Sequence, residues 1–391
     1  MTALKLTTFQ ATALRVLCAS VLFGILIAGL WPFHAPKNQV SWFSGGNGIL
    51  LGDYGSLLSE GAFKQSNTNE GASIEIWLEP SVIDDAGTIL SFYSPDHDSI
   101  SFALRQSLDD VALVRKSPRD RRRTRTSRIY GQHVFRDGQP VFLTISSGEQ
   151  GTAIYVNGSL ARLSSDFRFS NTDLTGQLVV GNSAVTTDTW SGQLKGLAIY
   201  DRQLSAIKVA ENYQGWAGIG HPSLSVSDGT VALYLFDEDT GNTVHNLVDS
   251  TTDLVIPQRF FVLHEPFLEQ PWNEYFAGWS YWKDVGVNIV GFIPLGFLFY
   301  AYFALLRRLD HSAAVTVAFG FAVSLTIEVL QAFLPTRNSG MTDLITNTGG
   351  TLLGVICCAW AAKQNWVAQA RVSVNSVTEE VRDDAQLAGR L

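Results

Sequence analysis

Polar and charged side chains recur inside hydrophobic stretches toward the carboxyl-terminal end of the chain. A charge at the centre of a membrane helix costs roughly 2.5–3.5 kcal/mol, so such residues are usually kept where they pair or function. An arginine there can hold an anion, a carboxylate can move a proton, and amides can hydrogen-bond a bound headgroup. The candidate ligand-binding residues are Asn288, Glu328, Gln331, Arg337, Asp343 and Asn347.

Four apolar stretches are each long enough to cross the roughly 30 Å hydrocarbon core of a bilayer as a helix. Residues 16–33, 285–306 and 344–362 contain no charged side chain, and residues 312–334 contain only Glu328. The first stretch ends in Trp-Pro-Phe, without the small residues of a cleavage site, which favours a retained helix over a removed signal peptide. The sequence therefore predicts a multi-pass protein of the cell (inner) membrane, with the lipid bilayer as its first partner.

Basic residues outside these stretches predict the orientation of the chain. They precede the first span, separate the second from the third, and follow the fourth, whereas the short loop between the third and fourth spans holds only Arg337. By the positive-inside rule, both termini are cytoplasmic and residues 36–284 are extracytoplasmic. The residues concerned are Lys5, Arg15, Arg307, Arg308, Lys363 and Arg371.

The long segment between the first two spans has the pattern of β-structure. Its short runs are rich in β-branched and aromatic residues, and pairs such as Asn157-Gly158 separate them as turns. Many short strands with turn signals indicate a two-sheet antiparallel sandwich. No cysteine lies in this segment, so disulfides do not hold it together. The predicted strands are 73–78, 88–93, 99–104, 141–145, 153–156, 177–180, 194–200 and 231–236.

The order of these motifs resembles the laminin-G-like, concanavalin A-like jelly rolls. The resemblance rests on Ser73-Ile-Glu-Ile-Trp-Leu78, on Ala153-Ile-Tyr-Val-Asn-Gly158 and on the run from Trp190 to Ser205. It implies a jelly-roll fold over residues 40–257. Domains of this kind commonly bind glycans or proteins, some of them with calcium, and a minority are glycoside hydrolases, so the fold alone does not decide the function.

Hydrolysis of a glycosidic bond needs two carboxyl groups about 5–9.5 Å apart. Glu75 and Glu79 point to the same side of one predicted strand, but Trp77 stands where the resemblance implies an aspartate. The simpler interpretation is that both are surface carboxylates. Residues 96–98 and 237–239 are acidic turns that offer oxygen ligands to calcium. Acidic turn residues are more often just solvated, so we expect no metal and no cofactor.

A basic run from Arg115 to Arg128 stands out in a segment that is otherwise acidic. Such a cluster can attract anionic lipid headgroups or an acidic envelope polymer. The alternative is a solvated hairpin between two strands, and the predicted external location argues against a nucleic acid partner. The candidate residues for binding an anionic surface are Arg115, Arg121, Arg122, Arg123 and Arg125.

The predicted directions of the spans bring the polar residues together in the outer half of the bilayer. Helical periodicity places them on one face of each helix, and glycines allow the helices to approach closely. A purely structural alternative is that Glu328 and Arg337 pair to hold the loop while the amides bridge helices. The face of the third span comprises Ser324, Glu328 and Gln331, and that of the fourth comprises Asp343, Asn347, Gly350 and Gly354.

The same residues resemble the VanZ-like membrane family, through Asn288-Ile-Val-Gly-Phe-Ile-Pro-Leu-Gly296, Glu328, Arg337 and the run 343–350. A first helix that ends in Pro32-Phe33 also matches, which implies that the β-segment is inserted between helices one and two. The expected fold is multidomain: a four-transmembrane-helix α bundle with an inserted all-β jelly-roll sandwich. The expected divisions are 1–36 (cytoplasmic terminus and first helix), 40–257 (sandwich), 258–284 (connector), 285–362 (helices two to four) and 363–391 (disordered cytoplasmic tail).

Three functions remain open. In the first, the external sandwich binds a glycan or a protein partner, and the polar pocket binds a lipid-linked or anionic headgroup. The VanZ-like resemblance implies a link with resistance to teicoplanin-type glycopeptides. In the second, the pocket is an intramembrane enzyme for a lipid-linked substrate, with Glu328 as general acid or base and Arg337 on a phosphate. The pocket holds no histidine or cysteine, which favours a non-enzymatic role. The third is a transporter, although no inverted repeat is visible.

Overall fold

The computed structural model describes residues 7–44, 46–65, 71–95, 99–120, 123–219, 229–274 and 278–388. The chain divides into two compact units. The helical unit comprises Met1–Phe33, Phe267–Phe333 and Asn338–Leu391. The β unit comprises His34–Pro266 and the short segment Leu334–Arg337.

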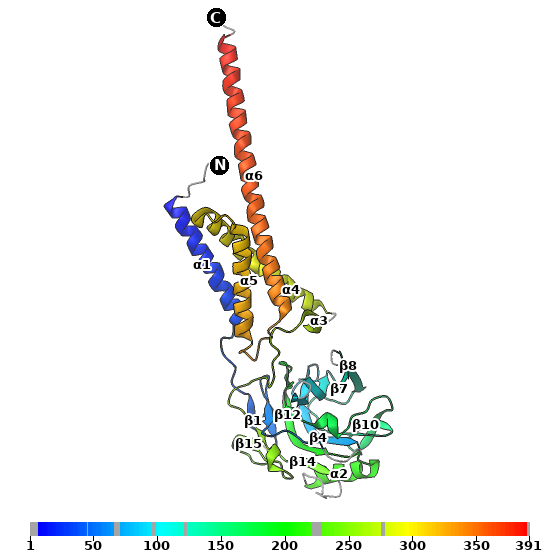
Figure 1. Ribbon diagram of the computed structural model, residues 1–391. Coiled ribbons are helices and arrows are strands. Elements are labelled where there is room, and N and C mark those ends of the chain that lie inside the picture. Colours follow the sequence, from blue (N-terminus) through cyan, green and yellow to red (C-terminus); the bar gives the residue numbers. More distant parts are fainter. Residues whose placement is uncertain are drawn as a thin grey trace. The chain divides into compact units, whose positions relative to one another are not determined.

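Four helices of the helical unit are long and apolar enough to cross a membrane (Figure 1). The four stretches predicted from the sequence are therefore helices that could cross a membrane. The unit consists of α1 (Thr8–Leu30), α3 (Pro271–Glu274), α4 (Trp279–Ala301) with its continuation η5 (Tyr302–Arg307), α5 (Ser312–Gln331) and α6 (Met341–Ala388). Phe292, Leu295 and Phe299 of α4 form an apolar cluster with Cys18 of α1 and Ile327 of α5.

Glycines allow α4 and α6 to pack backbone against backbone. A Cβ atom on Gly350 would clash with the carbonyl oxygen of Ile289, and one on Gly354 would clash with that of Ile293. Small residues of this kind are typical of close helix contacts in membranes. This packing sets the distance between the polar faces of the two helices.

The β unit contains two sheets in which every pair of neighbouring strands is antiparallel. The first has the order β1-β2-β13-β4-β9-β10-β11 with β14 also on β13, and the second has the order β15-β16-β3-β12-β5-β6-β7-β8. The first sheet consists of β1 (Val40–Trp42), β2 (Ile49–Leu51), β4 (Ala72–Pro80), β9 (Val141–Gly148), β10 (Gly151–Val156), β11 (Ser159–Ser164), β13 (Gly192–Tyr200) and β14 (Thr230–Tyr234). The second consists of β3 (Leu57–Ser59), β5 (Ala86–Ser94), β6 (Ser99–Ser107), β7 (Asp110–Asp120), β8 (Arg123–Gly131), β12 (Gln177–Val180), β15 (Thr243–Val244) and β16 (Leu254–Val255).

The principal core of the β unit is built from alternate residues of the strands. Ile74, Ile76 and Leu78 of β4 are fully buried in it, together with apolar residues of the second sheet such as Phe92 and Phe102. Each predicted strand overlaps an observed one, and the Asn157-Gly158 turn has the positive φ angles (50° and 76°) of a tight hairpin. The predicted multidomain fold, a jelly-roll sandwich together with four apolar helices that could cross a membrane, is therefore confirmed.

The β unit contains a helix that was not predicted, because the sequence pattern indicated β-structure throughout the segment between the first two spans. Helix α2 (Ala206–Ile219) lies on the face of the first sheet opposite to the principal core. Val209 and Trp216 of α2 pack on Phe142 and Tyr200 of the sheet. The spacing of Val209, Asn212 and Trp216 is helical, and these three residues are buried.

The structure continues α6 to Ala388, through most of the tail that the sequence analysis expected to be disordered. Residues 363–388 contain no proline and no glycine, and their alanine and glutamine residues favour a helix. The next glycine follows the helix directly at position 389. A polar sequence without helix breakers can extend an existing helix.

Candidate functional site

The helical unit brings several of the sequence-predicted residues into contact across its helices. Asn288 of α4 donates its amide hydrogen to Asp343 of α6, with an Nδ2–Oδ1 distance of 2.7 Å. Asn347, one turn further along α6, donates to the hydroxyl of Ser324 on α5 at 3.0 Å. The polar residues therefore connect α6 to both neighbouring helices.

Two carboxylates meet the start of α6. Glu328, which is 1% exposed, accepts a hydrogen bond from the backbone nitrogen of Gly340 at 2.8 Å. Glu274 accepts from the backbone nitrogen of Thr342 at 3.1 Å and from its hydroxyl. Free N–H groups and the helix dipole make a helix amino terminus a favourable place for negative charge. Glu274 was not predicted, because it lies in the connector and no apolar stretch surrounds it.

Two buried amide oxygens in this cluster have no hydrogen-bond partner among the described residues. They are Oδ1 of Asn347 and Oε1 of Gln331, whose residues are 5% and 7% exposed. The Nε2 atom of Gln331 donates to the carbonyl of Gly29 on α1 at 2.8 Å, so only its oxygen remains. An unpaired buried acceptor costs about 1–3 kcal/mol, which a ligand with hydrogen-bond donors would offset.

Arg337, the predicted anion partner, belongs to the segment Leu334–Arg337 of the β unit. Its backbone nitrogen donates to the carbonyl of Leu334 at 2.9 Å. Arg337 is thus assigned to the other unit, and the hydrogen bonds named above for the polar residues of the helical unit do not involve it.

The structure separates the two carboxylates that were considered for hydrolysis. Glu75 is fully buried beneath α2, whereas Glu79 is partly exposed. The Glu75 carboxylate accepts from the Tyr200 hydroxyl at 2.8 Å, the Asn212 amide at 3.1 Å and the Trp216 indole at 3.3 Å. Burial raises the pKa of Glu75, and these donors oppose the rise. A substrate cannot reach Glu75 in this arrangement, so the pair is not a hydrolytic site, and Glu75 is not the surface carboxylate expected from the sequence.

The acidic turns give little sign of a metal site. Residues 96–98 lie outside the described residues, and in the other turn Glu238 accepts from the backbone nitrogen of His245 at 2.7 Å. Asp109, Asp110 and His133 form a cluster that the sequence did not suggest, with their ligand atoms within 4.8 Å of one another. The Asp109 carboxylate accepts a hydrogen bond from Nδ1 of the His133 ring at 2.5 Å, and this bond raises the pKa of His133. An exposed histidine–aspartate ion pair explains this cluster without a metal.

The basic run forms the hairpin of β7 and β8 at the edge of the second sheet. Arg115 forms an ion pair with Asp173, with an Nε–Oδ1 distance of 2.8 Å. Arg121 and Arg122 lie outside the described residues, and the side chains of Arg123 and Arg125 are likewise not described. Binding of an anionic surface by this run stays a prediction.

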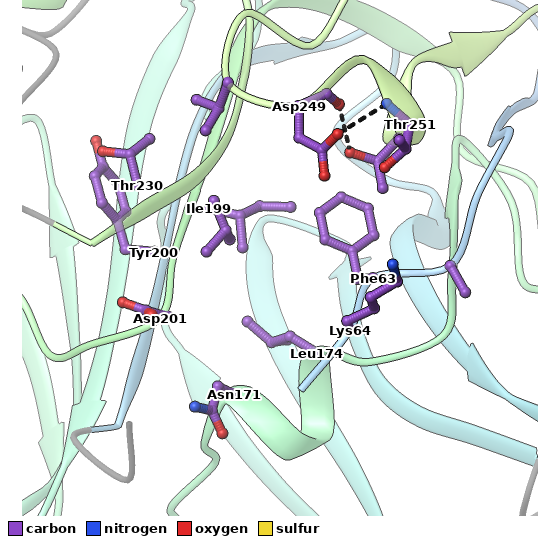
Figure 2. Close-up of a pocket in the computed structure, with 14 residues that line it drawn as sticks. Phe63, Lys64, Asn171, Leu174, Ile199, Tyr200, Asp201, Thr230, Asp249 and Thr251 are labelled. Carbon is purple, nitrogen blue, oxygen red and sulfur yellow. Dashed lines mark hydrogen bonds between the residues drawn. The ribbon is translucent and has the colours of Figure 1, made fainter. Parts of the chain in front are cut away.

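A cavity of about 330 Å³ lies in the β unit. It is lined by residues of the strands β13 and β14, of two short helices and of the loops near them. Figure 2 shows Phe63, Leu174 and Ile199 near its centre, with polar side chains around them. Leu174 and Asn171 come from the short helix η2 (Asn171–Leu174), Ile199 from β13, and Thr251 from the short helix η4 (Ser250–Thr252). The sequence did not predict this site, because its lining residues come from separate segments that share no motif. The polar lining includes Lys64, Asn171, Asp201, Thr230, Asp249 and Thr251.

Asp249 keeps a negative charge at the edge of this cavity. Its Oδ1 atom accepts from the backbone nitrogen of Thr251 at 3.0 Å, and hydrogen bonds from Thr251 hold the pKa of Asp249 below its usual value. Lys64 favours the same charged form from across the cavity. The cavity thus combines an apolar centre with hydrogen-bonding groups and charges of both signs at its edge.

Two family models match the chain. The VanZ/LLP1 model matches residues 231–362, and the model of the concanavalin A-like lectin/glucanases superfamily matches residues 46–210. The chain therefore contains a VanZ-like domain and a concanavalin A-like jelly-roll domain, as the sequence predicted. The VanZ/LLP1 match begins in β14 and so includes the last strands of the β unit.

No curated protein matches the chain significantly. Among solved structures, the receptor binding domain of botulinum neurotoxin C/D mosaic serotype is 15% identical with a TM-score of 0.35, and the match covers 48% of each chain. A heptameric SAP-like pentraxin from Limulus polyphemus is 16% identical with a TM-score of 0.33, over 58% of this chain and 94% of that one. This chain thus spans about half of the first of these, and the domain assignment rests on the two family matches.

Proposed function

We propose that this membrane protein recognises a glycan outside the cytoplasm through the cavity of its jelly-roll unit. The cavity is the main support for this proposal. Its apolar centre includes the aromatic ring of Phe63, and its edge is polar. This arrangement suits a sugar, which has an apolar ring face surrounded by hydroxyl groups. The name of the matching superfamily, which includes lectins, agrees with this function. The four apolar helices then act as the anchor that keeps the glycan site at the membrane surface.

A glycan array tests this function with the full chain in lipid nanodiscs. We expect binding to a defined subset of glycans above the signal of empty nanodiscs of the same lipid composition. If no glycan exceeds the empty nanodiscs, the jelly roll is not a glycan-binding module.

We also infer that the polar cluster of the helical unit binds a lipid headgroup in the outer leaflet. The unpartnered oxygens of Asn347 and Gln331 support this role, because they require donors. A lipid-linked headgroup with hydroxyl or ammonium donors meets this requirement better than a bare anion. Asn288, Glu328 and Asp343 lie in the same cluster and would surround that headgroup.

Native mass spectrometry of the purified protein checks the headgroup site. Asn347→Ala should lose a lipid that the wild-type chain retains, because it removes the unpaired oxygen. Ser324→Ala is the matched control, since it breaks the same hydrogen bond between α5 and α6 but leaves the Asn347 oxygen in place. If both variants carry the wild-type lipid complement, the cluster only joins the helices.

Neither catalysis nor a role in glycopeptide resistance forms part of this proposal. The described cluster offers carboxylates and amides but no histidine or cysteine nucleophile. Two of its carboxylates, Glu328 and Glu274, already accept hydrogen bonds from the backbone nitrogens of Gly340 and Thr342.

A further inference from the structure

Several apolar side chains belong to the wall of the cavity. Besides Phe63, Leu174 and Ile199, it includes Val231 and Val248. Phe63 and Leu174 are 7% and 4% exposed, so these side chains belong to the wall and are held by the core behind them. A hydroxyl group placed against such a wall without a partner costs roughly 1–3 kcal/mol. A ligand that fits must therefore bring an apolar group to the centre of the cavity.

The charges at the edge of the cavity balance each other. Lys64 lies across from Asp249 (Figure 2), and Asp201 has the guanidinium of Arg202 at 3.6 Å. A ligand with a net charge would meet an opposite and a like charge in the same cavity. A neutral ligand avoids this conflict and still finds donors and acceptors in Asn171 and Thr251.

The size of the cavity limits how much of a glycan enters. Its volume of about 330 Å³ is at the lower end of the range of about 300–1,000 Å³ for small-molecule sites. A long glycan chain needs an extended groove, whereas a cavity of this size holds a chain end. The site therefore selects a terminal sugar.

We propose that the cavity binds a neutral terminal sugar that carries an N-acyl group, with the acyl methyl against the accessible edges of Phe63 and Leu174. The amide of such a group supplies one donor and one acceptor next to its methyl, which matches an apolar centre inside a polar edge. The identity of the sugar rests on the proposed glycan-binding function and narrows its ligand class.

Three β-1,4-linked trisaccharides of equal length measure how much the acyl group contributes to the binding affinity, because they differ in the group at the 2-position of each sugar. The full chain in nanodiscs is titrated with triacetylchitotriose, with its deacetylated form and with cellotriose. We expect the acetylated trimer to bind about fivefold more tightly than cellotriose, from burial of the acyl methyl of its terminal sugar. The deacetylated trimer is positively charged and should bind no better than cellotriose. Equal binding of all three, or binding of none, overturns the acyl assignment.

A pair of neighbouring substitutions tests the location. Val248 lines the cavity and is 43% exposed, whereas Leu247 beside it is 54% exposed and is not part of the lining. Val248→Trp should fill the cavity and weaken binding of triacetylchitotriose at least about tenfold. Leu247→Trp adds the same side chain outside it and should leave binding near the wild-type value. A thermal melt of each variant verifies that both remain folded.

The outcomes distinguish this inference from the function on which it rests. If glycans bind on the array but Val248→Trp binds them as well as Leu247→Trp does, the sugar site lies elsewhere and the cavity assignment is wrong. If no glycan binds at all, the proposed function itself fails.

Discussion

Glu75→Ala should lower the free energy of unfolding of the β unit by about 3–5 kcal/mol, the size typical when a buried charged network loses one member. The substitution leaves the Tyr200 hydroxyl, the Asn212 amide and the Trp216 indole without their acceptor in a closed site. It also opens a hole between β4 and α2, which the surrounding side chains fill only in part. Urea unfolding of the detergent-solubilised chain, followed by tryptophan fluorescence, measures the loss.

Glu79→Ala provides the matched control on the same strand and the same face. Glu79 is partly exposed, so its loss should change the free energy of unfolding by no more than about 0.5 kcal/mol. Equal losses for the two variants would show that Glu75 does not hold α2 on the sheet.

The raised pKa of Glu75 also makes the free energy of unfolding depend on pH, in a direction that can be stated. Burial raises the folded-state pKa of Glu75 above its unfolded value, so the fold binds this proton more tightly than the unfolded chain. The associated stability is fully present below the unfolded pKa and is lost as the pH rises through the folded pKa. Glu75→Gln removes the titrating group, so its stability should vary less with pH over that range than the stability of the wild-type chain.

Gly354→Ala should disrupt the packing of α4 on α6 and lower the melting temperature of the helical unit in detergent. An alanine methyl at this position meets the carbonyl oxygen of Ile293 and, at 2.7 Å, the backbone nitrogen of Phe297. Backbone atoms cannot move aside as the end of a flexible side chain can, and overpacking of this kind costs about 1–3 kcal/mol or more. Separation of the helices would also move Asp343 and Asn347 away from their partners on α4 and α5.

Gly349→Ala is the control on the same helix. A Cβ atom at Gly349 has no heavy atom within 4 Å, and alanine is the better helix former, so this variant should be as stable as the wild type or slightly more so. A Gly354→Ala variant that melts at the wild-type temperature would contradict the close contact.

The strands and spans could be predicted because their signals are local. Alternation in β4 and the length of the apolar helices depend only on neighbouring residues, and the polar face of α6 follows from helical periodicity. The contacts between Asn288 and Asp343 and between Ser324 and Asn347 agree with that periodicity. Helical periodicity does not reveal whether these side chains bind a ligand.

Features that depend on distant segments escaped the sequence. Glu75 looked like a surface residue, because nothing on β4 itself indicates that α2 covers it. Glu274 lies in the connector, 68 residues before Thr342, whose backbone nitrogen it binds at the start of α6. The cavity draws its lining from segments between Ala62 and Thr252. In each case the decisive neighbour is set by tertiary packing.

Both proposed ligands require the β unit to lie outside the cytoplasm, and cysteine labelling in spheroplasts tests this requirement most directly. The native cysteines are Cys18, Cys357 and Cys358, and they are first replaced by alanine. Leu160, 57% exposed on β11, and Asp310, exposed between η5 and α5, are then changed to cysteine one at a time. We expect a membrane-impermeant maleimide to label Leu160→Cys in intact spheroplasts and Asp310→Cys only after lysis. Labelling of Leu160→Cys only after lysis would place the β unit in the cytoplasm and contradict both proposals.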